Sequence, residues 1–531
     1  MDCLMKKSIL LIIALLLWIT ASAKDLSKEL FEKVVFPVME TPAVYTATID
    51  DKDFLVFVEY SDSLLVKGHY MALEAKATDT LPFRLEARGR RARLYYNGER
   101  ETFRPRFELL DERHAEGKAR LSLLETVHFH LRIHEIPDFQ DFDNDRYQDT
   151  LFAVEEIDDL CYAKVLGYWS ELGDETDVTD KVFRLADAVN EVPLDLHLDI
   201  FRPANDTMTK HPLVMLVHGG AFYFGSKDDK SITRWCRHLA SLGYVTASID
   251  YRIGFLPNMS SIGRAGYRAV QDAHAAMRYL VSHQEEYGID TSMFFVGGAS
   301  AGAITVLNLA FMTNETRPSY TRKGFLRPEL GDIDTCGNAI KADFHIKGLV
   351  DMWGAMPDTA ALRGHNIPIL AFHGDADNIV PYDFNYPFDL ASPVNILLAE
   401  KMYGSSCIVD RAIKLGHQAQ LVTFSGFKHS PHVDPGTKAL NENFYIIQEM
   451  MSDFFYDLIA PKELEIIEDH SDYTVHPAPL ATSWKVEGGV ILSSGNDSLR
   501  VAWIKNAPQH AITISATLPY GIGVTETVNV K

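Results

Sequence analysis

Gly298-Ala299-Ser300-Ala301-Gly302 follows a short apolar run, residues 293–296, and precedes a helix-like run, residues 303–310. A Gly-x-Ser-x-Gly motif between a strand and a helix makes a sharp turn that projects the serine hydroxyl above the sheet. The first N–H groups of the following helix point toward the same space, where they can bind negative charge. Because the motif also occurs by chance, it indicates a nucleophile only if a base, an acid and further backbone donors accompany it.

Two glycines after another predicted strand are candidates for those donors. Residues 213–217 form a continuous apolar run, typical of a strand covered on both faces, and His218-Gly219-Gly220-Ala221 follows. One amide aimed at a developing oxyanion contributes roughly 2.7–4 kcal/mol. We expect the amides of Gly219, Gly220 and Ala301 to form an oxyanion hole, and the alternative for the two glycines is an ordinary turn.

Loops after two later predicted strands supply the titratable side chains. The loop after strand 367–372 holds Asp375 and Asp377, and a carboxylate there can fix the tautomer of an imidazole and stabilise it when charged. Asp377 is the preferred acid, because two further residues and then Val-Pro follow it. Asp375 is expected to brace the loop. The next strand's loop supplies His429 as the preferred base and His432 as the alternative.

The candidates occur in the order Ser300, Asp377, His429 along the chain. This is the order that α/β-hydrolases use. With His429 as general base, Ser300 would attack an ester carbonyl, and water would release the acyl group in a second step. This chemistry needs no metal and no organic cofactor, so we expect neither.

The strand and helix patterns predict an α/β fold with β-rich additions. Alternating strands and helices from about residue 194 to 459 predict a doubly wound, mostly parallel sheet. Short strand-like runs with a turn signal at Asn97-Gly98 predict an N-terminal antiparallel β-domain of meander or small-barrel type. Runs between residues 484 and 530 predict a small C-terminal β-sandwich. The expected divisions are a signal peptide at 1–23, the β-domain at 24–136, an acidic linker at 137–160, the catalytic domain at 161–461 and the β-sandwich at 462–531.

Three stretches allow more than one reading. Insertions at 313–345 and 383–418 are expected to form substrate walls, because they follow strands at the catalytic edge. The aromatic run 222–224 would line the pocket or pack in the core. The acidic segment 138–149 resembles a calcium loop, but Arg146 and Phe152 stand where that loop needs Gly and Glu. We therefore expect a solvated linker and no metal.

Composition and the N-terminus bear on location and partners. The chain has 531 residues and a formal net charge of −22, which disfavours nucleic acid as a partner. Lys6 and Lys7, an apolar run at 9–19 and Ala21-Ser22-Ala23 are typical of a cleavable secretory signal. We expect a secreted, periplasmic or cell-surface protein with no membrane span after cleavage, and the alternative is an uncleaved anchor.

Four cysteines lie beyond the predicted signal. They allow three full disulfide pairings, or buried free thiols. They are Cys161, Cys236, Cys336 and Cys407.

Taken together, the central motifs resemble the carboxylesterase/lipase family of α/β-hydrolases. The matching pieces are 218–222 with Gly225 and Ser226, 250–254, 271–280, and the motifs of Ser300, Asp377 and His429. The family's type-B branch usually has Glu in place of Ala299 and of Asp377, and the hormone-sensitive-lipase-like branch usually has Gly in place of Ala221. The chain is therefore more similar to secreted bacterial esterases.

That resemblance implies a small ester or an esterified polysaccharide, with acetyl or feruloyl groups, as substrate. The β-rich ends resemble accessory domains of Bacteroidetes surface proteins, and the tail resembles their PKD-like or immunoglobulin-like modules; both imply export.

Two other functions are compatible with part of this pattern. A prolyl-oligopeptidase-type peptidase shares the fold and the order of the three residues, but it normally carries a propeller with blade repeats, and the sequence has none. A non-catalytic adhesion protein built on a hydrolase domain would have lost the serine, the acid or the base, and all three are present.

Overall fold

The protein was analysed as a computed structural model, which describes the strands between residues 43 and 133 and the ranges 138–168, 191–255, 259–324, 328–388, 400–459, 464–503 and 507–530. The chain forms two compact units. Asn144–Lys462 with Tyr520–Ile522 make the first, and Met1–Asp143, Glu463–Pro519 and Gly523–Lys531 make the second. The predicted signal peptide lies outside the described residues.

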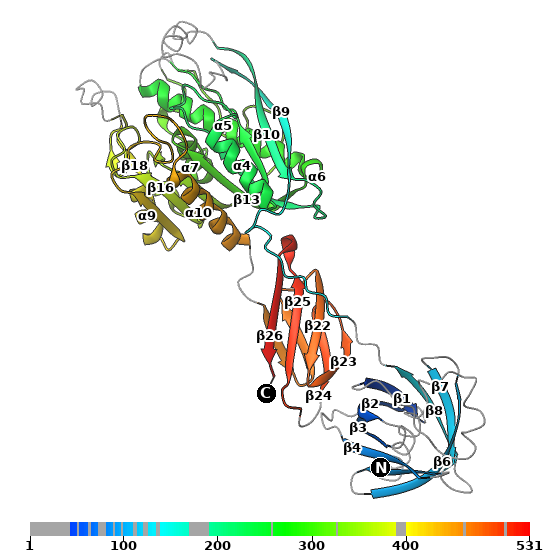
Figure 1. Cartoon of the computed structure of the whole chain (residues 1–531). Coiled ribbons are helices and arrows are strands. Elements are labelled where there is room, and N and C mark those ends of the chain that lie inside the picture. Colours follow the sequence, from blue (N-terminus) through cyan, green and yellow to red (C-terminus); the bar gives the residue numbers. More distant parts are fainter. Residues whose placement is uncertain are drawn as a thin grey trace. The chain divides into compact units, whose positions relative to one another are not determined.

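The first unit is built on an eight-stranded sheet with the order β19-β16-β14-β13-β11-β12-β10-β9 (Figure 1). The six strands from β19 to β12 are parallel, and β10 and β9 continue the sheet antiparallel. This confirms the predicted mostly parallel sheet. The strands are β9 (Val154–Gly167), β10 (Val192–Pro203), β11 (His211–Val217), β12 (Val245–Ile249), β13 (Ile289–Ala299), β14 (Ile346–Met352), β16 (Ile369–Gly374) and β19 (Ala419–Phe424).

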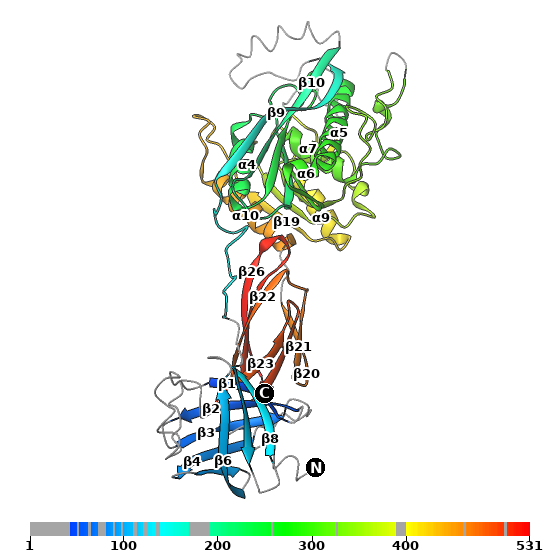
Figure 2. The same cartoon turned by 90° about the vertical axis from the view of Figure 1, so that its right-hand side faces the viewer.

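Helices cover both faces of this sheet, and so β11 and β12 are buried at every residue (Figure 2). The helices α5 and α7 pack against each other, as do α4 and α10. The helices are α4 (Lys230–Leu242), α5 (Met259–Ser282), α6 (Gln284–Tyr287), α7 (Ala301–Phe311), α9 (Ser405–Lys414) and α10 (Glu442–Ile459).

Local sequence signals fix the ends of α4. The Asp229 side chain accepts hydrogen bonds from the amides of Ser231 and Ile232 at 2.9 and 3.0 Å, which satisfies donors that a helix start leaves unpaired. Gly243, with φ of 120°, ends the helix in a conformation that favours glycine.

The first unit begins earlier than the predicted boundary at residue 161. Strand β9 starts at Val154, inside the segment that was predicted to be a solvated linker, and pairs with β10. Tyr147 is fully buried, and its amide donates to Leu242 O at 2.9 Å. The acidic residues of β9 misled the prediction because this edge strand exposes much of its length to water.

The predicted insertion 383–418 also differs from the structure. It contains α9, which packs against β16 and β19 as an ordinary crossover helix of the sheet. The part before α9 that is described, with β17 (Phe384–Asn385) and β18 (Met402–Gly404), interrupts the alternation of sheet strands and crossover helices. Strand β18 pairs with β17 and with β15 (Ala355–Met356).

The N-terminal strands form a closed antiparallel barrel. Each strand pairs with the next, and β1 pairs with β8 to close the ring. The strands are β1 (Ala43–Ile49), β2 (Lys52–Ser61), β3 (Leu65–Ala72), β4 (Leu81–Arg88), β5 (Arg91–Tyr96), β6 (Glu99–Leu109), β7 (His114–Arg120) and β8 (Thr126–Ile133).

The C-terminal residues form two small antiparallel sheets, with buried Val475, Trp484 and Ile514 among their apolar side chains. The closer likeness to immunoglobulin or PKD modules stays a prediction. One sheet has β20 (Glu465–Asp469), β21 (Asp472–His476), β24 (Ser498–Trp503) and β23 (Gly489–Ser494), and the other has β22 (Ala481–Glu487), β25 (Ala511–Thr517) and β26 (Gly523–Asn529).

Asp141 of the acidic segment is bound by hydroxyl groups, and the described cysteines are unpaired. Asp141 Oδ1 accepts hydrogen bonds from Thr525 Oγ1 at 2.7 Å and Ser515 Oγ at 3.2 Å, and the described residues contain no cluster that could hold a metal. The four cysteines beyond the predicted signal are all free thiols, so none of the disulfide pairings forms.

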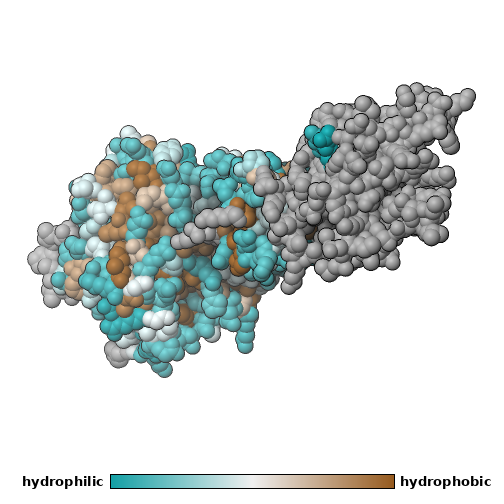
Figure 3. All heavy atoms as spheres, turned by 90° about the horizontal axis from the view of Figure 1, so that it is seen from below, coloured by the Kyte–Doolittle hydropathy of each residue, from teal (hydrophilic) through white to brown (hydrophobic). Residues whose placement is uncertain are grey.

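No described helix has the length and apolar character that a membrane crossing requires. On the face seen in Figure 3, apolar groups alternate with hydrophilic ones over the coloured part of the surface.

Candidate active site

The turn between β13 and α7 holds Ser300 in a conformation that side chains rarely adopt, with φ of 56° and ψ of −117°. Its amide donates to Met352 O at 2.9 Å, which ties the turn to the neighbouring strand. A Cβ on Gly298 would lie 2.4 Å from the Gly302 carbonyl group, and one on Gly302 would lie 2.1 Å from Val217 O. Both glycines are therefore required for the tight approach of α7 to the sheet.

The structure brings His429 and Asp377 to this serine from the loops after β19 and β16. His429 Nε2 lies 2.9 Å from Ser300 Oγ, and His429 Nδ1 lies 2.7 Å from Asp377 Oδ2. Asp377 Oδ1 accepts hydrogen bonds from the amides of Ile379 at 2.8 Å and Val380 at 3.1 Å. This geometry lets His429 take the serine proton while Asp377 fixes its tautomer.

Asp377 is well suited to stay ionised. Its side chain is fully buried, which by itself would raise the pKa of the carboxyl group. The hydrogen bonds from His373 and His429, the positive charge on His429 and the Ile379 amide outweigh burial, so the pKa lies well below its usual range.

The glycine loop after β11 lies directly against the serine. A Cβ built on Gly219 would be 3.3 Å from Ser300 Cβ. Within the described part of the chain, the amides of Gly219, Gly220 and Ala301 have no hydrogen-bond acceptor. The Tyr251 hydroxyl braces the loop by donating to the carbonyl oxygens of residues 218 and 219 at 3.1 and 3.2 Å. Unpaired amides at Gly219 and Ala301 beside the serine, and at Gly220 next in the loop, fit the predicted oxyanion hole.

The alternative acid and base lie elsewhere. Asp375 accepts from the Gly426 amide at 2.6 Å and from Ser425 Oγ at 3.0 Å, and so it braces two loops, as expected. His432 Nε2 lies 3.0 Å from Ser231 Oγ, and its ring stacks on Trp353 at 4.8 Å. Burial, followed by the charge on His429, lowers the pKa of His432 to about 4. Neither residue contacts Ser300.

Residues 198–366 match the family BD-FAE. This segment, about a third of the chain, is therefore similar to that family. It contains the glycine loop and Ser300, whereas Asp377 and His429 follow it.

Curated relatives match shorter stretches of the chain. Gut esterase 1 of Caenorhabditis elegans is 31% identical over 129 residues, which are 24% of this chain and 22% of that protein. The neuroligin-like protein glit-1 of the same organism is 31% identical over 115 residues, 21% of this chain and 15% of that protein. The chain thus spans about a fifth of the length of these curated relatives.

Two solved structures match the chain with TM-scores below 0.5. An esterase from Thermogutta terrifontis has a TM-score of 0.36 and 18% identity, and the match covers 51% of this chain and 90% of that one. A truncated carbohydrate esterase from gut microbiota has a TM-score of 0.35 and 19% identity, covering 58% and 98%.

The BD-FAE segment supplies most of a cavity of about 380 Å³ that opens on Ser300. Its wall is mainly apolar, and loops after several strands contribute to it. The lining residues are Ala221, Phe222, Ile262, Gly263, Gly266, Tyr267, Val270, Ser300, Ala301, Ile304, Asn308, Met312, Pro318, Ser319, Tyr320, Pro357, Ile379, Val380, Pro387, Phe388, Glu400, Lys401 and Met402.

Two glycines of α5 leave space for aromatic rings in this wall. A Cβ on Gly263 would lie 2.9 Å from the Tyr320 ring, and one on Gly266 would lie 3.4 Å from the Phe222 ring. Of the predicted run 222–224, only the first residue lines the cavity. Tyr223 packs against Phe255, and Phe224 is exposed.

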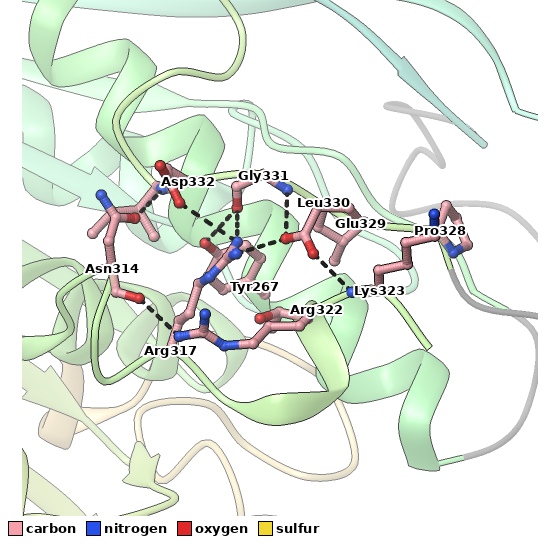
Figure 4. Close-up of polar contacts among 12 residues, drawn as sticks. Tyr267, Asn314, Arg317, Arg322, Lys323, Pro328, Glu329, Leu330, Gly331 and Asp332 are labelled. Carbon is pink, nitrogen blue, oxygen red and sulfur yellow. Dashed lines mark hydrogen bonds and ion pairs between the residues drawn. The ribbon is translucent and has the colours of Figure 1, made fainter. Parts of the chain in front are cut away.

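Arg317 lies just before the cavity residues Pro318 and Tyr320 in the chain. Figure 4 shows its contacts with Glu329 and Gly331. Its guanidinium binds Glu329 at 2.6 Å and contacts the carbonyl oxygen of Gly331. The hydroxyl of Tyr267, a cavity residue, donates to the same carbonyl at 2.8 Å. The insertion 313–345 thus forms a braced wall of the cavity. The sequence analysis predicted that this range would form a wall but did not say which of its residues would line the cavity.

Proposed function

We propose that the chain is a serine esterase that cleaves carboxylic esters through Ser300, His429 and Asp377. The observation that carries this proposal is the hydrogen-bonded series Asp377–His429–Ser300, with contacts of 2.7 and 2.9 Å, facing unpaired amides beside an apolar cavity. The match of residues 198–366 to the BD-FAE family supports it.

The reaction proceeds in two stages. In the first, His429 Nε2 accepts the proton as Ser300 Oγ attacks the ester carbonyl, and the amides of Gly219, Gly220 and Ala301 bind the oxyanion. His429 then gives the proton to the departing alcohol oxygen, which leaves an acyl-enzyme. In the second stage His429 deprotonates a water molecule that attacks the acyl carbonyl, and Ser300 is released with the acid.

For the substrate, we propose short acyl esters or polysaccharide-linked acetyl and feruloyl esters. A mostly apolar cavity of about 380 Å³ beside the serine suits an apolar acyl group. The polar alcohol or sugar would stay at the open side.

The test compares para-nitrophenyl acetate, para-nitrophenyl butyrate and methyl ferulate with the wild-type protein and with Ser300→Ala. We expect hydrolysis of at least one ester by the wild type and none above background by the variant. A folded wild-type protein that hydrolyses none of them, or cleaves only a peptide para-nitroanilide, would refute the esterase proposal.

We further propose export by the predicted signal peptide, which rests on residues 1–23 alone. Expression of the full chain in a secreting bacterial host should yield mature protein that begins at Lys24. Retention of an intact N-terminus on the cytoplasmic side would contradict it.

A further inference from the structure

A second group of buried polar side chains lies behind Asp377, on the side away from Ser300. His373 is the second-last residue of strand β16, Asp351 lies on β14, and Ser405 begins α9. All three have no exposed surface. The esterase mechanism uses none of them, and isolated polar groups are costly to bury without partners.

Short contacts join these side chains in series. Asp351 Oδ2 lies 2.8 Å from Ser405 Oγ, and Ser405 Oγ lies 2.7 Å from His373 Nδ1. His373 Nε2 lies 3.2 Å from Asp377 Oδ2 and 3.3 Å from Val380 O. Asp351 Oδ1 accepts the Gly354 amide at 2.8 Å. The series therefore ends on the oxygen of Asp377 that also accepts from His429.

Counting hydrogens fixes the protonation of this series. Three contacts need a hydrogen between their heavy atoms: Asp351–Ser405, Ser405–His373 Nδ1, and His373 Nε2 with its two acceptors, Val380 O and Asp377 Oδ2. Ser405 supplies one hydrogen and a neutral imidazole supplies one. The third is an additional proton, because two bare acceptors would otherwise face each other at hydrogen-bond distance.

The additional proton can be held in two ways. Either His373 is an imidazolium between two carboxylates, or Asp351 is protonated and His373 is neutral. In the second form Asp351 donates to Ser405, whose hydroxyl donates to His373 Nδ1. In both forms Nε2 of His373 carries a hydrogen that Val380 O and Asp377 Oδ2 share as acceptors. Asp377 stays ionised because its other oxygen accepts two amides.

We propose that His373, held by Ser405 and Asp351, is a positioning residue. Its Nε2–H, shared by Val380 O and Asp377 Oδ2, sets how strongly Asp377 stabilises a protonated His429. The proposal rests on the esterase function proposed above. Besides these partners, the ring of Tyr382 lies edge-on to His373 at 5.6 Å. No step of the reaction moves the additional proton, since it is present before and after turnover.

The first test is the dependence of kcat/KM on pH in four proteins: wild type, His373→Leu, His373→Gln and Asp351→Asn. In His373→Leu the acid limb should move to higher pH by about one unit, because Asp377 with one donor fewer holds the proton of His429 more tightly. We expect kcat to fall about tenfold while KM changes less than about twofold. His373→Gln, whose amide can donate to Asp377, should restore the acid limb.

Asp351→Asn is the matched control for the proton count. Its amide can donate to Ser405 Oγ in place of the additional proton, so the acid limb should stay and kcat should remain within about threefold of wild type. A folded His373→Leu protein with the wild-type profile overturns the proposal. So does Asp351→Asn if it loses as much kcat as His373→Leu.

A second measurement needs no activity and no folded His373→Leu protein. In the full-length protein labelled with ¹⁵N-histidine, the His373 Nε2 signal, assigned by its absence in His373→Gln, should be that of a protonated nitrogen from pH 6 to 8. A bare Nε2 overturns the proposal even if esterase activity is found. A protein without esterase activity but with a protonated Nε2 would refute the proposed function and leave the hydrogen-bond assignment standing.

Discussion

Gly219 lies against Ser300 so closely that a Cβ atom on the glycine would be 3.3 Å from the serine Cβ and 3.1 Å from the carbonyl oxygen of Ala299. Gly219→Ala should therefore shift the loop and misdirect its amide. Since one lost oxyanion donor costs about 10²–10³ in kcat, we expect kcat on a para-nitrophenyl ester to fall about 10²-fold. Gly436→Ala is the control, because its Cβ would meet only Asp434 Oδ1 at 3.4 Å. Equal activity of the two variants would contradict an oxyanion role for this loop.

The two neighbouring histidines should respond differently to removal. His429→Ala should lower kcat by about 10⁴-fold or more, because the serine loses its general base. His432→Ala should keep kcat within about fivefold but destabilise the first unit by about 1–3 kcal/mol, because it leaves Ser231 without its partner and a gap beside Trp353. Steady-state kinetics and urea unfolding measure the two effects, and the reverse pattern would make His432 the base.

Acidification should destabilise the protein through His432. Its pKa of about 4 in the folded state lies below the ordinary value of 6.5. The unfolded chain therefore binds more protons between these values, so the stabilisation is complete above about pH 6.5 and is lost as the pH falls toward 4. The loss amounts to at most about 3 kcal/mol for this group.

His432→Phe, which cannot titrate, should flatten the fall in unfolding free energy over that pH window. Urea unfolding followed by tryptophan fluorescence measures it, because Trp235 and Trp353 both contact His432. If the unfolding free energy fell with the same slope in wild type and variant, His432 would take up its proton at the same pH in the folded and the unfolded protein, which would contradict the lowered pKa.

The braced wall of the cavity should affect substrate binding more than chemistry. Arg317→Ala releases the loop that carries Pro318 and Tyr320, so KM should rise about tenfold while kcat changes less than about threefold. Arg322→Ala is the control, since this exposed side chain donates to Asn314 O at 3.1 Å and does not line the cavity. An unchanged KM for both acetate and butyrate esters would show that the wall does not contact the acyl group.

The sequence was sufficient to predict the α/β sheet and to select Ser300, Asp377 and His429, because each follows a recognisable strand and their order is restricted. It indicated the insertions 313–345 and 383–418 as walls, and residues of both line the cavity, but it could not predict which side chains do so. Tyr267 and Tyr320 lie on α5 and in the insertion after α7, and only long-range packing brings them together. The additional pair Asp351 and Ser405 was missed for a similar reason, since β14 and α9 are far apart in the chain. The early start of β9 was missed because an exposed edge strand resembles a polar linker.

The crowding at the turn between β13 and α7 also limits which substitutions this turn can accept. Gly298 and Gly302 have carbonyl groups within 2.4 Å of where a Cβ would stand. In a combinatorial library randomised over residues 298–302, active clones should keep Gly298, Ser300 and Gly302 and vary only at Ala299 and, within small residues, at the buried Ala301. New substrate preferences would therefore be selected in the loops around the cavity rather than at the nucleophile.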